Sequence, residues 1–160
     1  MAIGSRSPKL GNAGLGFFLR EAYRTYGREL ERRFAKHGIT QLQFTLLWIL
    51  FIEGQLSQVD LATRAGIRRA SATDDLEVLK KRKLIRGLRD SEDKRKIIIS
   101  LTNSGSDLVA VLADQAAETN RIARGQMSKL EYRHLFEMLD QVASNLNETA
   151  KIKTHSLSVA

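Results

Sequence analysis

The sequence predicts a mainly α-helical fold with a small β-wing, made of a winged helix-turn-helix lobe and a second helical lobe. Three observations lead to this prediction. Apolar residues recur at steps of three and four over most of the 160 residues, which is the period of an amphipathic helix. Two short helical segments are separated by a glycine-bearing turn at Gly66. After Lys83 the pattern changes to two short apolar runs around an all-polar stretch, as in a β-hairpin.

The first predicted helix runs from Leu15 to His37 and buries one apolar face. Its opposite face carries Arg20, Arg24, Arg28 and Arg32 at steps of four, interleaved with glutamates. We interpret this row as a solvated charged face rather than a binding stripe. Gly38 is expected to end this helix, and Thr40 to cap the start of a strongly apolar helix that stops at Gly54.

A helix-turn-helix is predicted next. Ser57 opens a short helix that Gly66 ends, and the following segment places Ala72, Leu76 and Leu79 on one face. The second of these helices is therefore the expected recognition helix.

The wing is predicted from the segments LIRGL (84–88) and KIIISL (96–101), which are rich in β-branched residues. Between them the chain is entirely polar, so it has nothing to bury. From residue 80 to residue 100, nine Lys or Arg residues oppose three acidic ones. Most of the formal net charge of +8 therefore belongs to this one segment.

The last third of the chain is helical again, and Ser128 with Glu131 forms a capping box for the final helix. The terminal helices, over 10–38 and 104–148, have more apolar surface than a monomer of this layout covers. We expect them to join two copies in a two-fold dimer. The alternative is an intramolecular four-helix packing, in which these faces are covered within one chain. Residues 149–160 lack periodicity and are expected to form a flexible tail.

Composition excludes several classes of function. The chain has no cysteine, and its three histidines lie far apart, so neither a disulfide nor a metal site is expected. No cofactor motif, nucleophile elbow or glycine-rich phosphate loop is present, which argues against an enzyme. The start of the sequence is polar and no apolar run reaches the roughly 18 residues of a membrane span, so we expect a cytoplasmic protein. The basic charge points to a polyanion, either nucleic acid or a membrane surface.

Three motifs stand out: LGFFLREAYRTYGRELERRFAKHGIT in the first helix, SQVDLATRAGI in the helix-turn-helix and DSEDKRKIIISLTNSG across the wing. Together with the order of elements, they resemble the multiple antibiotic resistance regulator (MarR) family over about residues 10–148. The wing motif is the most specific. It combines D-x-R (Asp93 to Arg95) with L-T-x-x-G (Leu101 to Gly105). The resemblance implies one MarR-like domain over 1–160, with its winged helix-turn-helix lobe over 40–103.

The resemblance also implies roles for residues of the wing and the recognition helix. Arg95 would enter the minor groove of DNA, where a guanidinium suits the negative potential, and Asp93 would hold the wing in shape. Arg68 stands where such proteins commonly have a Ser or Thr cap, and Lys83 where many have glycine. The candidate DNA-binding residues are Arg68, Arg69, Ser71, Thr73, Asp74, Arg86, Arg89, Asp93, Lys94, Arg95 and Lys96.

Two acids in the recognition helix are unusual beside phosphates. One of Asp74 and Asp75 could accept a hydrogen bond from cytosine N4 in the major groove. The alternative, which we favour for Asp75, is a local ion pair with Arg82, Lys81 or another base.

The resemblance further implies a small-molecule effector, such as an aromatic carboxylate, a phenol or an acyl-CoA thioester. Candidate pocket residues are Phe17, Arg20, Tyr23, Tyr26, His37 and Trp48, although core packing explains most of them equally well. The predicted function is a sequence-specific transcriptional regulator, a ligand-released repressor that binds a pseudo-palindromic operator as a homodimer. The alternatives are a nonspecific or architectural nucleic-acid-binding protein and a winged-helix protein-interaction module.

Overall fold

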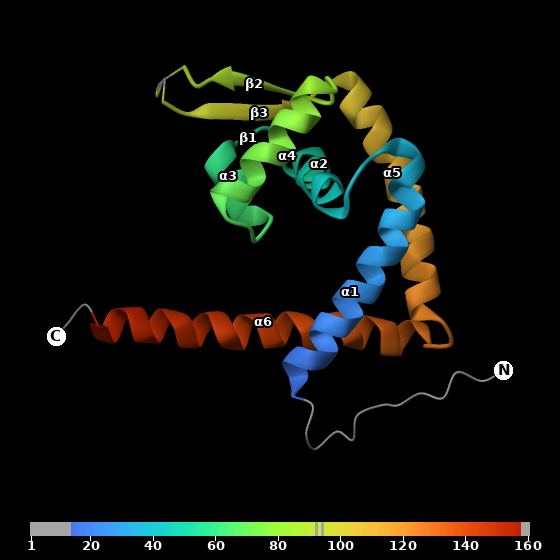
Figure 1. The fold of residues 1–160 in the computed structure, drawn as a ribbon. Helices are drawn as coiled ribbons and strands as arrows, with labels where there is room; N and C mark the ends of the chain where they lie inside the picture. Colours follow the sequence, from blue (N-terminus) through green and yellow to red (C-terminus); the bar gives the residue numbers. More distant parts are fainter. Residues whose placement is uncertain (1–13, 92, 94, 158–160) are drawn as a thin grey trace. The chain divides into compact units, whose positions relative to one another are not determined.

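The computed structural model describes residues 14–91, 93 and 95–157, and their side chains as far as residue 148. The chain forms two compact units, Met1–Thr119 and Asn120–Ala160. The elements, shown in Figure 1, are α1 (Leu15–Phe34), η1 (Ala35–His37), α2 (Gln41–Glu53), β1 (Leu56–Ser57), α3 (Gln58–Arg64), α4 (Arg69–Lys81), β2 (Ile85–Arg89), β3 (Ile97–Leu101), α5 (Asn103–Arg124) and α6 (Lys129–Leu157). The predicted fold class, mainly helical with a small β-wing, is confirmed. No helix within the described residues is both long and apolar enough to cross a membrane.

The helix boundaries in the first half of the chain follow from local capping. Gly38 adopts φ +59°, in the left-handed region, and ends the turn that follows α1. Thr40 and Gln43 form a capping box at the start of α2, in which each side chain bonds the backbone N–H of the other residue. Ser57 caps α3 through the backbone N–H of Asp60.

The sheet has three strands rather than the two of the predicted hairpin. Its order is β1-β3-β2 and both pairings are antiparallel. In the wing, Ile85 lies opposite Leu101 and Arg89 lies opposite Ile97. The short β1 adds Leu56 opposite Ile99, which ties the helix-turn-helix to the base of the wing. Figure 1 shows β2 and β3 extending together as a hairpin beyond α3 and α4.

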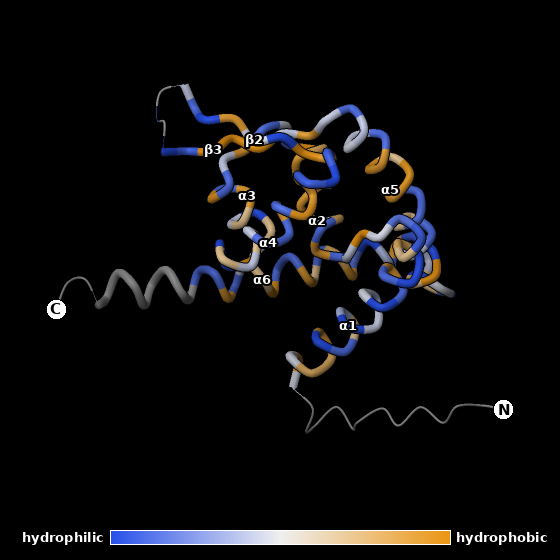
Figure 2. Tube along the Cα trace, turned by 45° about the horizontal axis from the view of Figure 1, so that its top comes forward, coloured by the Kyte–Doolittle hydropathy of each residue, from blue (hydrophilic) through white to orange (hydrophobic). Residues whose placement is uncertain are grey.

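One apolar core holds the first unit together. It is built mostly from α2, the helix-turn-helix and the first part of α5. Figure 2 shows that hydrophobic and hydrophilic residues alternate along these elements. Burying each such side chain contributes about 1.5–3 kcal/mol relative to leaving it in water. The largest fully buried side chains are Phe34, Leu46, Leu47, Leu61, Leu79, Leu112 and Val109.

The L-T-x-x-G motif fixes the junction between the wing and α5. The Thr102 hydroxyl donates to the backbone oxygen of Lys83 at 2.7 Å and accepts from the backbone N–H of Gly105 at 3.0 Å. A Cβ on Gly105 would lie 2.0 Å from the backbone oxygen of Leu84, so only glycine fits this close approach. Lys83 adopts φ +58°, which explains why glycine suits the same position in similar proteins.

The second unit consists of the end of α5 and α6. Ser128 and Glu131 form the predicted capping box at the start of α6. The helix continues to Leu157, past residue 148, where the sequence predicts its end. The extension is understandable because residues 149–157 contain neither glycine nor proline. No residue from 120 to 148 is buried, and the large apolar side chains exposed on α6 are Leu130, Phe136, Met138, Leu139 and Leu146.

Candidate nucleic-acid interface

The recognition helix α4 presents a polar face opposite its buried one. Ala72, Leu76 and Leu79 are buried, at steps of four and three. The candidate residues on this helix are all exposed: Arg68, Arg69, Ser71, Thr73 and Asp74. Arg68 occupies the N-cap position, but its side chain caps no backbone N–H. A guanidinium has no acceptor atom, so the start of α4 lacks the side-chain cap that a Ser or Thr would supply.

Thr73 is held by a residue that sequence reasoning did not single out. The side-chain amide of Gln58, the first residue of α3, donates to the Thr73 hydroxyl at 3.1 Å. That hydroxyl in turn donates to the backbone oxygen of Arg69 at 3.0 Å. Gln58 therefore joins the two helices of the helix-turn-helix on their exposed side. The only sequence signal for it is its place directly after the Ser57 cap.

The turn of the wing is organised by two aspartates. Asp90 accepts a hydrogen bond from the backbone N–H of Asp93 at 2.8 Å. The Asp93 carboxylate accepts from the backbone N–H of Arg95 at 3.1 Å and from its Nε at 3.0 Å. The Arg95 side chain is 91% exposed despite this pair. Asp93 thus sets the direction of Arg95 while leaving its guanidinium accessible.

The electrostatics of the wing keep Asp93 ionised. The side-chain hydrogen bond from Arg95, then the bond from the Arg95 backbone N–H, lower the pKa of Asp93 below its ordinary value, and the charge of Lys96 adds to this. The Asp93 carboxylate is therefore ionised throughout the neutral range. An ionised aspartate is the form that accepts hydrogen bonds from both the backbone and the guanidinium.

Basic residues from α4 and the wing converge on one surface hollow of about 340 Å³, which we call the basic hollow. Arg69 reaches it from the start of α4, and Arg95 and Lys96 reach it from the wing. The start of α3 also lines it. The full lining is Ser57, Gln58, Val59, Asp60, Arg69, Arg95, Lys96 and Ile97. Arg69 therefore shares one cationic surface with Arg95 and Lys96, which lie 26 and 27 positions later in the sequence.

The remaining basic candidates lie elsewhere or outside the described residues. Arg86 lies farther from the wing turn, where its Nε donates to the Ser100 hydroxyl at 3.1 Å. It lines a separate hollow of about 410 Å³ together with Lys83. Arg89 is exposed at the last position of β2, beside the turn. Lys94 lies outside the described residues. Figure 2 shows hydrophilic residues where β2 and β3 approach the turn.

Asp75 has a different partner from the expected one. Its carboxylate accepts a hydrogen bond from the buried side-chain amide of Gln43 on α2 at 2.8 Å. Arg82, a predicted partner, instead donates to two backbone carbonyl groups after α1. The prediction of a local ion pair is therefore wrong for Asp75, because the carboxylate faces α2 rather than the end of its own helix.

The six effector candidates take part in different contacts. The Trp48 ring stacks on Phe51, with centroids 5.8 Å apart, and Phe17 packs edge-on against Phe18. Tyr26 packs against the core, and His37 shares a hydrogen bond with Gln115 on α5. Arg20 and Tyr23 are exposed. Neither hollow described above is lined by any of these six residues.

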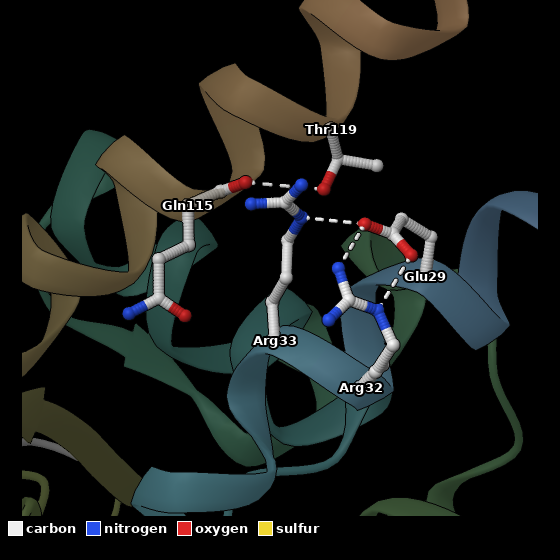
Figure 3. Close-up of polar contacts among 5 residues, drawn as sticks. All are labelled: Glu29, Arg32, Arg33, Gln115 and Thr119. Carbon is white, nitrogen blue, oxygen red and sulfur yellow. Dashed lines mark hydrogen bonds and ion pairs between the residues drawn. The ribbon is translucent and has the colours of Figure 1, made fainter.

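A polar cluster lies between α1 and α5, as Figure 3 shows. Glu29 accepts hydrogen bonds from both Arg32 and Arg33, and these bonds lower its pKa to about 2. Arg33 extends toward α5 between Gln115 and Thr119. The Thr119 hydroxyl donates to the backbone oxygen of Gln115 at 3.1 Å. The last turns of α1 therefore place a charged cluster beside α5.

Comparison with known proteins identifies the family to which the chain belongs. The sequence pattern of the MarR family matches residues 39–97. The homoprotocatechuate degradative operon repressor of Escherichia coli is 31% identical over 122 residues, which are 76% of this chain and 80% of that protein. The HTH-type transcriptional repressor NicR of Pseudomonas putida is 28% identical over 114 residues, covering 71% of this chain and 72% of NicR.

A solved structure agrees with the sequence comparison. It is that of Bordetella bronchiseptica BpsR, whose DNA binding is regulated by 6-hydroxynicotinic acid. It superposes with a TM-score of 0.74 at 27% identity, over 80% of this chain and 97% of BpsR. These matches confirm the resemblance carried by the helix-turn-helix and wing motifs: the chain belongs to the MarR family.

Proposed function

We propose that this protein is a transcriptional repressor that binds a pseudo-palindromic operator as a homodimer and leaves it when a small molecule binds. The observation that carries the proposal is the basic hollow, where Arg69 of the recognition helix meets Arg95 and Lys96 of the wing. A recognition helix in the major groove and a wing arginine in the adjacent minor groove use both parts of this surface. The named repressors among the relatives support the same function rather than an enzymatic one.

The homodimer is supported by the second unit. Met138, Leu139 and Leu146 on α6 are exposed, and no residue from 120 to 148 is buried. A helix pair of this kind needs a partner surface, and a second copy supplies one with matching symmetry. Two recognition helices related by a two-fold axis then read two half-sites. Because the partner we propose is operator DNA, we also propose that the protein works in the cytoplasm.

The effector we propose is a hydroxylated aromatic carboxylate. BpsR responds to 6-hydroxynicotinic acid, and the Escherichia coli relative is a repressor of a homoprotocatechuate degradative operon. The site for such a ligand stays the prediction made from the sequence, namely Phe17, Arg20, Tyr23, Tyr26, His37 and Trp48.

The test is a footprint of the purified protein on the DNA upstream of its own gene, repeated over a range of salt concentrations. We expect a protected inverted repeat. Each neutralised phosphate adds about −0.9 to the slope of log affinity against log salt, and we expect roughly six to ten contacts for the dimer. A slope near zero would remove the nucleic-acid assignment. If unrelated duplexes are protected equally well, the protein binds DNA nonspecifically and the repressor assignment is wrong.

A further inference from the structure

Asp74 differs from every other acidic residue described in the winged helix-turn-helix lobe. Each of the others forms an ion pair or a hydrogen bond with a described residue. The pairs are Glu53 with Arg64, Asp60 with Ser57, Asp75 with Gln43, Glu77 with Lys80, Asp90 with the backbone of Asp93, and Asp93 with Arg95. Among the described residues, Asp74 has no hydrogen bond or ion pair. Its carboxylate is therefore uncompensated among the described residues of this basic lobe.

The position of Asp74 on α4 explains why it has no partner. Residues three and four positions away on a helix are the neighbours that can pair. For Asp74 these are Ala70, Ser71, Glu77 and Val78, and none of them is a cation. Asp74 is also the sixth residue of α4, beyond the first turn where the helix dipole favours an acid. Neither an ion pair within α4 nor the helix dipole therefore stabilises the Asp74 carboxylate.

The side chain is also placed toward the DNA that the proposed function implies. Ala72 and Leu76, two residues before and after Asp74, are buried in the core. A two-residue step turns a helix by about 200°. Asp74 therefore lies on the side of α4 that faces away from the core, together with Ala70, and this is the side that enters the major groove.

An uncompensated carboxylate on this face lowers affinity for any duplex, because it is repelled by the phosphates. In the major groove it is also repelled by guanine O6 and N7 and by thymine O4, which are all acceptors. Cytosine differs, since its N4 amino group is a donor and no acceptor stands beside it on that edge. Adenine offers a donor at N6, but with the acceptor N7 next to it.

We propose that Asp74 is a specificity-determining residue that accepts a hydrogen bond from cytosine N4 in each half-site and disfavours duplexes that lack this base. The proposal rests on the proposed function, since it needs α4 in the major groove. It assigns to Asp74 a discriminating role rather than a share of the overall affinity. As a result, the protein binds duplexes without this cytosine more weakly.

The experiment selects binding sites from a pool of randomised duplexes with the full-length wild-type protein and with three variants. Asp74→Ala should lose the preference for cytosine at one position of each half-site while binding random duplexes more tightly than wild type. The wild-type preference at that position should be roughly 5- to 150-fold, the range of one good base contact. Asp74→Asn should change the preferred base to adenine, because an amide pairs with adenine N6 and N7.

The matched control is Glu77→Gln, which removes one negative charge from the same helix but from a residue paired with Lys80. It should tighten binding to random duplexes and leave the preferred sequence unchanged. If Asp74→Ala and Asp74→Asn both select the wild-type sequence with the same cytosine preference, the role of Asp74 is overturned while the repressor function stands. If the wild-type protein itself enriches no sequence, the proposed function and this inference both fail.

Discussion

The guanidinium of Arg82 donates a hydrogen bond to the backbone oxygen of His37, 2.7 Å away and 45 positions earlier in the chain. A second bond runs from the same guanidinium to the oxygen of Gly38 at 2.6 Å. Arg82 is the C-cap residue of the recognition helix, so this clamp joins the end of α4 to the turn between α1 and α2. The His37 imidazole in turn shares a hydrogen bond of 3.0 Å with Gln115 on α5.

Arg82→Ala should destabilise the fold by about 1–3 kcal/mol, because it removes two charge-assisted hydrogen bonds from a connection between distant segments. The measurement is chemical denaturation followed by circular dichroism. Lys81→Ala is the matched control, since it removes the same charge from the neighbouring exposed position. Equal effects of the two substitutions would show that only the charge of Arg82 matters.

Gly105→Ala should destabilise the protein by about 1–3 kcal/mol, as overpacking does. The added methyl group would lie 2.0 Å from the backbone oxygen of Leu84, which the wing holds in place. Gly16→Ala on α1 is the control, because its Cβ meets nothing within 4 Å and alanine favours a helix. Thermal unfolding of both variants tests this explanation of the motif, and similar melting temperatures would contradict it.

Asp75→Ala should cost about 1–3 kcal/mol by leaving the buried amide of Gln43 without its acceptor. Asp75→Asn keeps an acceptor oxygen at the same distance and should cost much less. The difference between the two variants, measured by urea denaturation, isolates the hydrogen bond from the charge. If Asp75→Asn is as destabilising as Asp75→Ala, the charge of the carboxylate and not the bond to Gln43 is responsible.

The sequence-based predictions are accurate where the interacting residues lie close together in the sequence, and less accurate where they lie far apart. The cap at Thr40 and the capping box of Ser128 with Glu131 were predictable because the interacting groups lie within one turn. The wing strands were predictable from their β-branched composition. By contrast, β1 has only two residues, and it is a strand because Leu56 meets Ile99 far along the chain.

In the candidate site, too, local features were predictable from the sequence and long-range contacts were not. Exposure of Arg69 and of Arg95 followed from the amphipathic pattern and the polar turn. Their convergence on one hollow depends on how α4 packs against the sheet, which no local pattern encodes. Sequence proximity likewise suggests Arg82 for Asp75, whereas the partner is Gln43, 32 positions away. Tertiary contacts of this kind become visible only once the core has fixed which helix faces meet.

Arg95→Ala should lower operator affinity by about 1–3 kcal/mol per half-site while leaving the fold and the dimer intact, because its side chain is 91% exposed and packs against nothing in the core. Its carboxylate partner Asp93 already directs the guanidinium outward, so the side chain is pre-organised for a narrow groove. Lys94→Ala should cost less, since a flexible ammonium contributes mainly charge.

Arg95→Lys separates a minor-groove contact from a phosphate contact. Lysine keeps the charge but lacks the planar fork, and its more strongly hydrated ammonium is harder to desolvate in a narrow groove. We therefore expect Arg95→Lys to lose much of the affinity lost by Arg95→Ala, with a salt slope close to that of the wild type. The measurement is fluorescence anisotropy with the footprinted operator over a range of salt concentrations. Wild-type affinity of Arg95→Lys across that range would make Arg95 one more phosphate contact and exclude its minor-groove role.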